Sequence, residues 1–432
     1  MNKRKTILAT TVILTLSLLA ACVSNEGMSG LPEEPEIPPA QEQTELPPEE
    51  PRQVVHPNFD HININTPGND SDDDRDSGQT QDTGADPVKE RIAEIIESMT
   101  LRDKICQMLI VTPDSITGIS GTTIAGDVTE AALENYPVGG IIQFSPNIVS
   151  SEQILLFNTA LQRYSEIPLL IAVDEEGGRV ARLQSSIGAH SVRAMLTYED
   201  DGEETAYENA VILSDALRRH GFNTNFAPVA DVWSNRSNTV IGNRAYSTDF
   251  DIAAVLVAAA VRGFNDSNIA CSLKHFPGHG NTREDSHHRT AYVNKTLDEL
   301  REDELKPFIS GIAAGTDMVM TGHLIVPGAD ELPATLSKVL ITDVLRDELG
   351  FDGVVITDSL AMNAISRHFS ASEVAVKAVD AGVDIILMPV NIDETISALI
   401  AAVESGEIPE SRIDESVSRI LKVKISIGII EL

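Results

Sequence analysis

The chain has 432 residues and carries 32 Lys and Arg against 66 Asp and Glu, a formal charge of −34. Apolar residues make up 42% of the chain, enough to form a large core, so wholesale disorder is excluded. The acidity argues against a nucleic-acid partner, because contact with phosphates needs clustered Lys and Arg, and three cysteines are too few for a disulfide framework.

Residues 1–21 have the features of a targeting signal. They open with the basic run Lys3-Arg4-Lys5 and continue in an apolar stretch, Thr6 to Leu19, that is short for a membrane-spanning helix. The stretch ends in Leu19-Ala20-Ala21-Cys22, which resembles a bacterial lipobox. That resemblance implies cleavage before Cys22, lipid attachment to Cys22, and a location on the extracytoplasmic face of the cell membrane. An ordinary secretory signal, in which Cys22 is incidental, is the alternative.

Residues 22–87 differ in composition from everything after them. Residues 23–86 hold 16 acidic and 2 basic residues, and ten of the 21 prolines fall between Pro32 and Pro87. Such a segment cannot bury enough apolar surface to offset its ordering entropy, and its like charges repel. We therefore expect a disordered, extended tether that connects the membrane anchor to a folded domain at 88–432. A partner-binding role for the acidic run Asp70–Asp76 is the alternative.

The folded part alternates short apolar runs with amphipathic stretches. Continuous Val, Ile and Leu runs are typical of strands that are buried on both faces of a parallel sheet. Eight such units predict an α/β fold, a closed (β/α)8 barrel of the TIM type. An open doubly wound sheet is the alternative, but no Gly-x-Gly-x-x-Gly follows the first run. The eight runs are Gln107–Val111, Gly140–Phe144, Leu169–Val173, Asn223–Pro228, Ile269–Leu273, Asp317–Thr321, Val354–Thr357 and Asp384–Met388.

Charged residues follow five of these runs. Barrels of this type carry their active sites at the C-terminal ends of the strands. Acids and bases are mixed at these ends, which predicts a polar site at the barrel mouth. The residues are Asp174-Glu175-Glu176, Asp231, Lys274-His275, His323 and Asp358. Cys106 and Cys271 have apolar neighbours, so we expect them to be buried free thiols.

The segment after the fifth run holds four of the ten histidines within 14 residues. Its Pro and Gly residues exclude a regular helix and predict a long loop. In such a loop Asp285 and His287 can approach closely enough for the carboxylate to orient the imidazole for proton transfer. A metal site is the competing interpretation, and its ligands would be His275, His279 and His287.

Four stretches resemble, in the same order, the motifs of the β-N-acetylhexosaminidases of glycoside hydrolase family 3. Lys274–His287 has the form K-H-F-P-G-H-G-x4-D-S-H, and the others are Asp174–Arg182, Ile241–Tyr246 and Val355–Met362. The resemblance covers essentially all of residues 88–432. The D-S-H extension is its most specific part, because the β-glucosidases of the family generally lack the D-x-H.

The resemblance implies a retaining double displacement. Asp358 would attack the anomeric carbon, and water would open the glycosyl-enzyme intermediate. His287, paired with Asp285, would donate the proton in place of the second carboxylic acid that most retaining glycosidases use. Substrate positioning would fall to Asp174, Arg182, Arg244, Lys274 and His275. Structural ion pairs within the mouth, such as Asp174 with Lys274, are the alternative for these residues.

The expected function is release of terminal β-linked N-acetylglucosamine from peptidoglycan-derived sugars, with no cofactor and no metal. The expected partners are a carbohydrate substrate and, through Cys22, the membrane. Three alternatives stay open: a β-glucosidase or β-xylosidase, a phosphorylase of the same family, and a surface lipoprotein that binds sugars without turning them over.

Overall fold

The structure, a computed structural model, describes residues 86–283 and 291–432. Residues 1–21, Cys22, the tether up to residue 85, and the pair Asp285 and His287 therefore lie outside the described residues. Within the described ranges, no helix combines the length and hydropathy needed to cross a bilayer.

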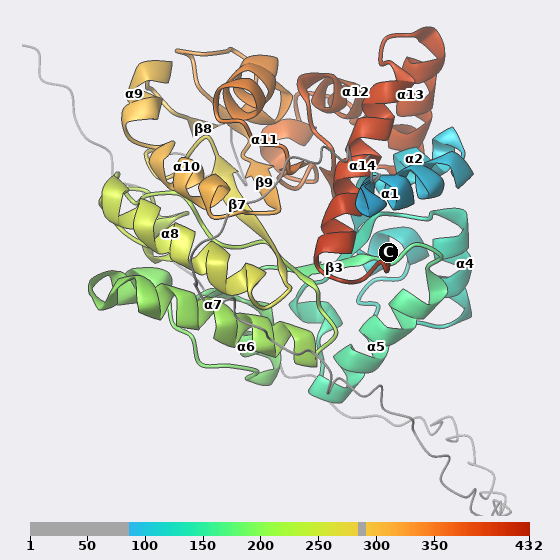
Figure 1. Ribbon diagram of the computed structural model, residues 1–432, viewed down its shortest axis with the longest axis horizontal. Helices are drawn as coiled ribbons and strands as arrows, with labels where there is room; N and C mark the ends of the chain where they lie inside the picture. Colours follow the sequence, from blue (N-terminus) through green and yellow to red (C-terminus); the bar gives the residue numbers. More distant parts are fainter. Residues whose placement is uncertain (1–85, 284–290) are drawn as a thin grey trace, which may run out of the picture. The chain divides into compact units, whose positions relative to one another are not determined.

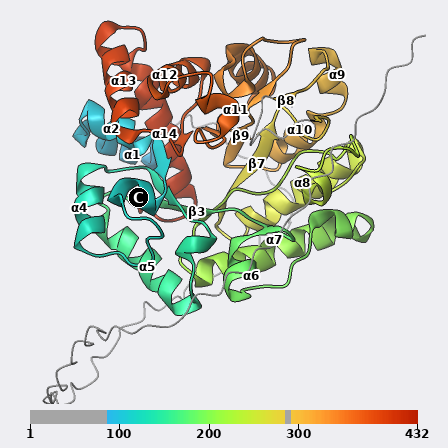
Figure 2. The same ribbon diagram turned by 180° about the vertical axis from the view of Figure 1, so that it is seen from behind.

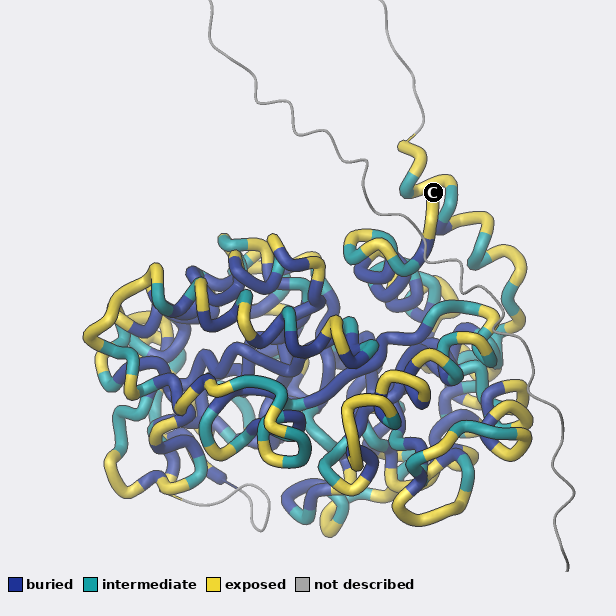
Figure 3. Tube along the Cα trace, turned by 90° about the horizontal axis from the view of Figure 1, so that it is seen from below, coloured by how far each residue is buried: buried dark blue, intermediate teal, exposed yellow. Residues whose placement is uncertain are grey.

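Eight parallel strands form the central sheet, in the order β11-β9-β7-β6-β3-β2-β1-β12. Every neighbouring pair is parallel, as the continuous apolar runs predicted. The residues of the barrel strands are buried, and the helices lie around them (Figures 1 and 3). The strands are β1 (Leu109–Val111), β2 (Gly140–Ile142), β3 (Leu170–Val173), β6 (Thr224–Asn225), β7 (Ala270–Phe276), β9 (Met318–Thr321), β11 (Val354–Thr357) and β12 (Ile386–Leu387).

The sheet closes where β11 meets the segment that leads into β12. Ile356 and Ile385 form a parallel bridge, and Thr357 N donates to Ile385 O at 3.0 Å. Leu360 N also donates to Leu387 O at 3.0 Å. Because the first and last strands of the order are joined in this way, the predicted (β/α)8 barrel is confirmed, and the open doubly wound sheet was the wrong alternative.

Only Val354–Thr357 has the predicted bounds, and the other seven strands differ by one to three residues at one or both ends. Two of these differences bear on the site. β7 extends to Phe276, so Lys274 and His275 lie on the strand itself rather than after it. The fourth strand keeps only Thr224–Asn225 of the predicted Asn223–Pro228. Pro228 has no N–H to donate, and the chain beyond β6 continues along β7 through irregular bonds, Ser272 N to Ala227 O at 2.8 Å among them.

Helices follow the strands and surround the barrel (Figures 1 and 2). The amphipathic stretches 152–165, 203–220, 370–381 and 392–404, which the sequence predicts as helices, correspond to α5 (Ser151–Tyr164), α7 (Gly202–Arg219), α12 (Ala371–Ala381) and α13 (Ile392–Ser405). Local capping sets several starts: Ser150 Oγ accepts from Gln153 N at α5, and Ser370 and Glu373 form a capping box at α12. The helices are α1 (Pro87–Ser98), α2 (Leu101–Gln107), α3 (Pro113–Thr117), α4 (Asp127–Asn135), α5 (Ser151–Tyr164), α6 (Arg182–Ile187), α7 (Gly202–Arg219), α8 (Phe250–Asn265), α9 (Leu297–Glu302), α10 (Lys306–Ala313), α11 (Asn363–Ser366), α12 (Ala371–Ala381), α13 (Ile392–Ser405) and α14 (Glu410–Ser426).

Shorter elements complete the described residues. One π-helical stretch, Val339–Glu348, precedes β11, and two small two-stranded pairs lie outside the barrel. These pairs are β4 (Glu175–Gly177) with β5 (Val180–Ala181), antiparallel, and β8 (Ala291–Tyr292) with β10 (Leu324–Ile325), parallel. The 3-10 helices are Ser145–Asn147, Met195–Asp201, Gly242–Arg244 and Ala334–Leu336.

A buried carboxylate stabilises the contact between β11 and β12 that closes the barrel. Asp384, just before β12, accepts Val355 N at 2.9 Å and pairs with Arg346 at 2.5 Å. Its other oxygen faces Arg412 at 3.2 Å and Arg419 at 3.3 Å, both from α14. The side chain of Asp384 is fully buried, so its charge is stabilised by these partners rather than by water.

Both described cysteines are buried free thiols, as predicted. Burial raises the pKa of the Cys106 and Cys271 thiols to about 12. Both thiols are therefore protonated at neutral pH, and their role is that of core residues.

Candidate active site

A cavity of about 290 Å³ opens at the C-terminal ends of the barrel strands. Its apolar wall includes Phe144, Phe226 and Met320, and its polar wall carries acids and bases together. All five predicted substrate-binding residues line it, and so does the predicted nucleophile. The charged and titratable residues of the lining are Asp174, Glu176, Arg182, Arg244, Lys274, His275 and Asp358.

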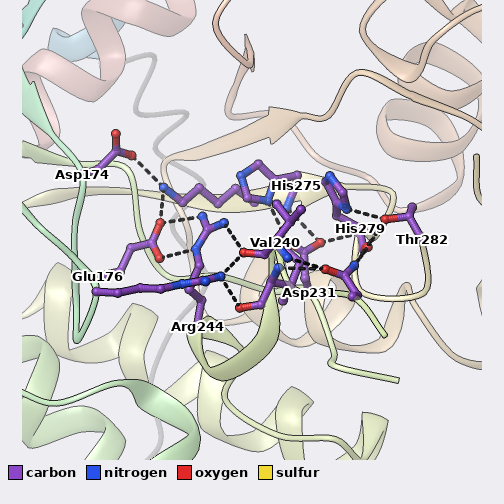
Figure 4. A network of polar contacts seen from close by, with 12 residues as sticks. Asp174, Glu176, Asp231, Val240, Arg244, His275, His279 and Thr282 are labelled. Carbon is purple, nitrogen blue, oxygen red and sulfur yellow. Dashed lines mark hydrogen bonds and ion pairs between the residues drawn. The ribbon is translucent and has the colours of Figure 1, made fainter. Parts of the chain in front are cut away.

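Four of these side chains form a continuous chain of ion pairs (Figure 4). Lys274 Nζ, from β7, lies 2.7 Å from both Asp174 Oδ1 and Glu176 Oε1. Arg244 donates two hydrogen bonds to Glu176, from Nε to Oε2 and from Nη2 to Oε1, each at 2.8 Å. The segment after β3 thus supplies the two acids, the 3-10 helix Gly242–Arg244 supplies Arg244, and β7 supplies Lys274. The ion pair of Asp174 with Lys274, named above as the structural alternative, is present.

Burial makes the charge of this chain depend on its partners. Desolvation opposes ionisation of Glu176, but Arg244 and Lys274 outweigh it and hold the pKa of that carboxyl well below its usual range. Burial alone would lower the pKa of Lys274, whereas the charges of Asp174 and Glu176 raise it. Glu176 and Lys274 therefore stay ionised at neutral pH. The two acids and the two bases of this chain of ion pairs cancel in formal charge. The pocket is therefore suited to an uncharged substrate.

Arg182 stands at the edge of this network. Its Nη2 lies 3.8 Å from Asp174 Oδ2, and its guanidinium lies 5.7 Å from the centre of the Phe144 ring. It is the more exposed of the pocket cations, with 31% of its side chain accessible. Arg182 therefore retains donors for a ligand, as a substrate-binding role requires.

The buried carboxylate of Asp231 holds His275 in place through two hydrogen bonds. Its Nδ1 donates to Asp231 Oδ2 at 2.6 Å, and its backbone N donates to Asp231 Oδ1 at 3.1 Å. His279 N also donates to Asp231 Oδ1, at 2.6 Å. Desolvation would raise the pKa of Asp231, but its interactions with His275 and His279 lower it. Asp231 therefore fixes both the ring of His275 and the start of the loop that follows β7.

His279 is buried beside this pair. Its Nδ1 lies 2.8 Å from Thr282 Oγ1, and its ring packs edge-on against that of His275 with centroids 5.9 Å apart. Burial lowers the pKa of His279 to about 4, so the imidazole is neutral at physiological pH. Among the described residues no group of three or more His, Cys, Asp or Glu could hold a metal ion. The third member of the competing metal interpretation, His287, lies outside them.

Asp358 follows β11 directly and faces the same cavity. Its backbone N donates to Thr321 O at 3.0 Å, and its Oδ1 accepts Ser359 N at 2.7 Å. His323 supports the next residue, because its Nε2 donates to Ser359 O at 2.9 Å while its Nδ1 contacts Thr335 Oγ1 at 2.8 Å. The carboxylate is thus presented at a strand end whose backbone is tied to the neighbouring strand.

The structure adds three supporting residues that the sequence did not assign to the site. The sequence indicates Glu176, Asp231 and His323 only as charged or titratable residues at strand ends. The signal for Glu176 was its place in the Asp174–Arg182 turn, and that for Asp231 was its position after the fourth strand. Their partners are distant in sequence, which is why pattern alone did not pair them.

A larger cavity, of about 630 Å³, lies between α1 and α14. Its lining comes from these helices and from Asp352, which precedes β11, so it sits at the N-terminal side of that strand. In barrels of this type, that end contributes to stability and the opposite end carries the chemistry. The smaller cavity at the mouth is therefore the candidate active site.

A parallel (β/α)8 barrel whose mouth holds three carboxylates and three cations around one cavity defines an enzyme of the TIM-barrel class. The protein-family model described as "Glycosyl hydrolase family 3 N terminal domain" matches residues 100–423 of this chain. The chain therefore belongs to glycosyl hydrolase family 3.

Similar proteins agree with this assignment. The chain is 35% identical over 335 residues to "Beta-hexosaminidase A" of Pseudoalteromonas piscicida, covering 70% of this chain and 56% of that protein. It is 38% identical over 292 residues to a "Beta-hexosaminidase" of Stenotrophomonas maltophilia, covering 65% of this chain and 85% of the relative. The match thus spans little more than half of the first relative and most of the second.

Solved structures show the same relationship. A glycoside hydrolase family 3 β-N-acetylglucosaminidase from Paenibacillus superposes with a TM-score of 0.72 at 40% identity, covering 78% of this chain and 65% of that one. The M tuberculosis protein LpqI superposes with a TM-score of 0.67 at 32% identity, covering 77% of this chain and 96% of that one.

Proposed function

We propose that the protein is a retaining exo-β-N-acetylhexosaminidase that releases terminal β-linked N-acetylglucosamine, with peptidoglycan-derived sugars as its substrates. The observation that carries the proposal is the position of Asp358 in one cavity with Asp174, Arg244 and Lys274. The names of the relatives, β-hexosaminidase and β-N-acetylglucosaminidase, support the same activity.

Asp358 is the proposed nucleophile. Its carboxylate attacks the anomeric carbon as the leaving-group oxygen takes up a proton, and water then opens the glycosyl-enzyme ester with retention of configuration. Asp174 accepts hydrogen bonds from sugar hydroxyls. Arg182, Arg244 and Lys274 donate to hydroxyl and acetamido oxygens, and His275, whose Nδ1 is bound to Asp231, contacts the sugar through Nε2.

The proton donor has to be a group that is protonated in the resting enzyme. Glu176 is ionised, because Arg244 and Lys274 hold its pKa low, and Asp174 is engaged with Lys274 at 2.7 Å. Neither carboxylate is suited to the acid role that a second carboxyl usually fills in retaining glycosidases. This supports His287 as the acid and base, with Asp285 orienting it, on the strength of the D-S-H motif.

The decisive experiment is hydrolysis of 4-nitrophenyl β-glycosides by the purified protein, in buffers with and without phosphate. We expect the highest kcat/KM for the N-acetylglucosaminide, with the glucoside and xyloside far behind and no acceleration by phosphate. A faster glucoside or xyloside would replace the proposal by a β-glucosidase or β-xylosidase. Phosphate-dependent release of sugar phosphate would make the enzyme a phosphorylase, and binding without turnover would leave a sugar-binding protein.

Glu176→Gln should lower kcat/KM on the N-acetylglucosaminide by about 10²-fold, the size of loss that a small misplacement of substrate-positioning groups produces. The carboxamide keeps the shape of the side chain but no longer aligns Lys274 and Arg244. Steady-state kinetics checks this, with Glu203→Gln as the control, since Glu203 pairs with Arg262 on the surface. Near-normal kinetics of Glu176→Gln would mean that the network is dispensable for substrate binding.

We also propose that Cys22 anchors the protein to the extracytoplasmic face of the membrane and that residues 23–87 act as a tether. The lipobox-like Leu19-Ala20-Ala21-Cys22 and the acidic, proline-rich composition support this. The Cys22→Ser variant, produced in a bacterial host that processes lipoproteins, should lose incorporation of labelled fatty acid and leave the membrane fraction. Activity on the aryl glycoside should be unchanged. Membrane retention of Cys22→Ser would refute the anchor.

A further inference from the structure

Glu175 is a buried carboxylate on the same short strand as Glu176. Its side chain is fully buried and does not line the active-site cavity, and it has no part in the proposed mechanism. Glu175 lies on β4, opposite Ala181 of β5. Successive side chains of a strand point to opposite faces, so Glu175 points away from the cavity that Glu176 lines. An acid buried in this way needs partners of its own, because burial of an unpaired charge is costly.

The first partners of Glu175 are backbone N–H groups of α6, the helix that begins at Arg182. The N-cap residue of this helix, Ala181, makes no side-chain hydrogen bond to it. Glu175 accepts these donors instead, Leu183 N on Oε2 at 2.7 Å and Gln184 N on Oε1 at 3.1 Å. They are the N–H groups that a capping side chain normally satisfies. The carboxylate therefore fixes the two peptide groups that follow Arg182.

The third donor to Glu175 is the imidazole of His190. His190 Nε2 lies 2.6 Å from Glu175 Oε1, and His190 Nδ1 accepts Val192 N at 3.1 Å. Because Nδ1 is an acceptor, the ring hydrogen lies on Nε2, which donates to the carboxylate. Only 1% of the His190 side chain is accessible, so solvent does not supply a substitute donor. The carboxylate of Glu175 is thus held between His190 and the first turn of α6.

The backbone around this pair is fixed as well. Glu175 N donates to Asn225 Oδ1 at 3.0 Å, and Asn225 Nδ2 donates to Glu175 O at 2.9 Å. The segment after His190 packs against the hairpin turn, where Gly178 N donates to Val192 O at 3.2 Å and a Cβ on Gly178 would lie 2.7 Å from Ala194. The pair of Glu175 and His190 therefore forms a rigid link between β4 and α6.

Arg182 is the cavity residue that this link can affect most. Its partner carboxylate oxygen, Asp174 Oδ2, is 3.8 Å away, and its Nε is buried with no hydrogen-bond partner among the described residues. Arg244, by contrast, is held by two hydrogen bonds of 2.8 Å to Glu176. The side-chain contacts of Arg182 therefore do little to place its guanidinium, and its backbone at the start of α6 decides where the group lies.

We propose that Glu175 and His190 are positioning residues, which set the place of Arg182 in the active-site cavity by fixing the first turn of α6. The proposal rests on the proposed function, because it takes Arg182 as a contact of the sugar. Without the N–H of His190, Glu175 keeps a buried acceptor unmet, shifts toward another donor and releases α6. Arg182 binds the sugar in the ground state and in the transition state alike, so its displacement raises KM more than it lowers kcat.

The test compares two replacements of His190 in the full-length enzyme, with 4-nitrophenyl β-N-acetylglucosaminide as the substrate. His190→Leu removes the donor and should lower kcat/KM about 10- to 100-fold, mainly through KM, the size of loss that a small misplacement of a positioning group produces. His190→Gln keeps an N–H donor and should recover most of the lost kcat/KM. His220→Leu is the matched control, because His220 is also buried and its Nδ1 lies 2.6 Å from Ala216 O at the end of α7, outside the cavity.

The same replacement in an Arg182→Ala background separates positioning from a general loss of stability. There His190→Leu should cost little further kcat/KM, because the group it positions is already absent, whereas it should lower the melting temperature equally in both backgrounds. If His190→Leu does not fold, Glu175→Gln takes its place in the comparison, since the amide keeps the shape but has one acceptor oxygen for three donors.

Three results would overturn the proposal: normal kinetics of His190→Leu, an equal loss of kcat/KM in both backgrounds, or a His190→Gln variant as impaired as His190→Leu. The wild-type enzyme is assayed in the same series. If it did not hydrolyse the N-acetylglucosaminide at all, the proposed function would fail instead, so the two failures are distinguishable.

Discussion

Asp358→Asn should lower kcat on the aryl N-acetylglucosaminide by about 10⁴-fold or more, a loss of the size that removing a catalytic nucleophile produces. The amide has nearly the shape of the carboxylate and still accepts Ser359 N, which lies 2.7 Å from Oδ1 in the native protein. The other side chains of the pocket, among them Asp174 and Lys274, are unchanged. We therefore expect the variant to bind N-acetylglucosamine while failing to turn the substrate over.

Stopped assays measure the turnover, and calorimetric titration with N-acetylglucosamine measures the binding. Asp352→Asn is the control, because Asp352 lies at the opposite end of β11 and is 76% exposed. A second check uses a 2-fluoro glycoside with a good leaving group, which should label wild-type Asp358 covalently and leave the variant unlabelled. Labelling of another residue would move the nucleophile elsewhere in the pocket.

His287→Ala should separate proton donation from the rest of the mechanism. A phenolate leaves with little assistance, whereas a sugar alkoxide needs a proton. We expect the loss on a disaccharide to exceed the loss on the activated aryl glycoside by about 10²-fold or more, the lower range of what general acid catalysis contributes. On the aryl substrate the glycosyl-enzyme intermediate should accumulate, because its hydrolysis lacks a general base.

Asp285→Ala should give the same pattern in milder form, since Asp285 only orients the imidazole. The neighbouring His288→Ala is the control, because the motif does not require that residue. Equal slowing of both substrates by His287→Ala, together with inactivation of the wild type by a chelator, would favour the metal interpretation over the dyad.

The fold was predictable from the sequence because its signal is local. Each barrel strand is buried on both faces, so runs such as Val354–Thr357 are continuously apolar and stand out from the amphipathic helices between them. Counting eight of them predicted the barrel. The rule that barrel chemistry lies at the strand ends selected Asp174, Lys274, His275 and Asp358, whereas Arg182 and Arg244 came from the family resemblance. Strand lengths were less predictable, because Pro228 interrupts the ladder at β6 while β7 runs on to Phe276.

The sequence by itself thus determined the architecture, the family resemblance, and the predicted site residues that the described part brings together in one cavity. Only the tertiary structure decided how those residues are charged and held. Glu176 is ionised because Arg244, 68 positions away, donates to it twice, and His275 is oriented by Asp231, 44 positions away. Contacts at such separations arise from the closure of the barrel, which brings the ends of different strands together, and no periodicity along the chain encodes which acid meets which base.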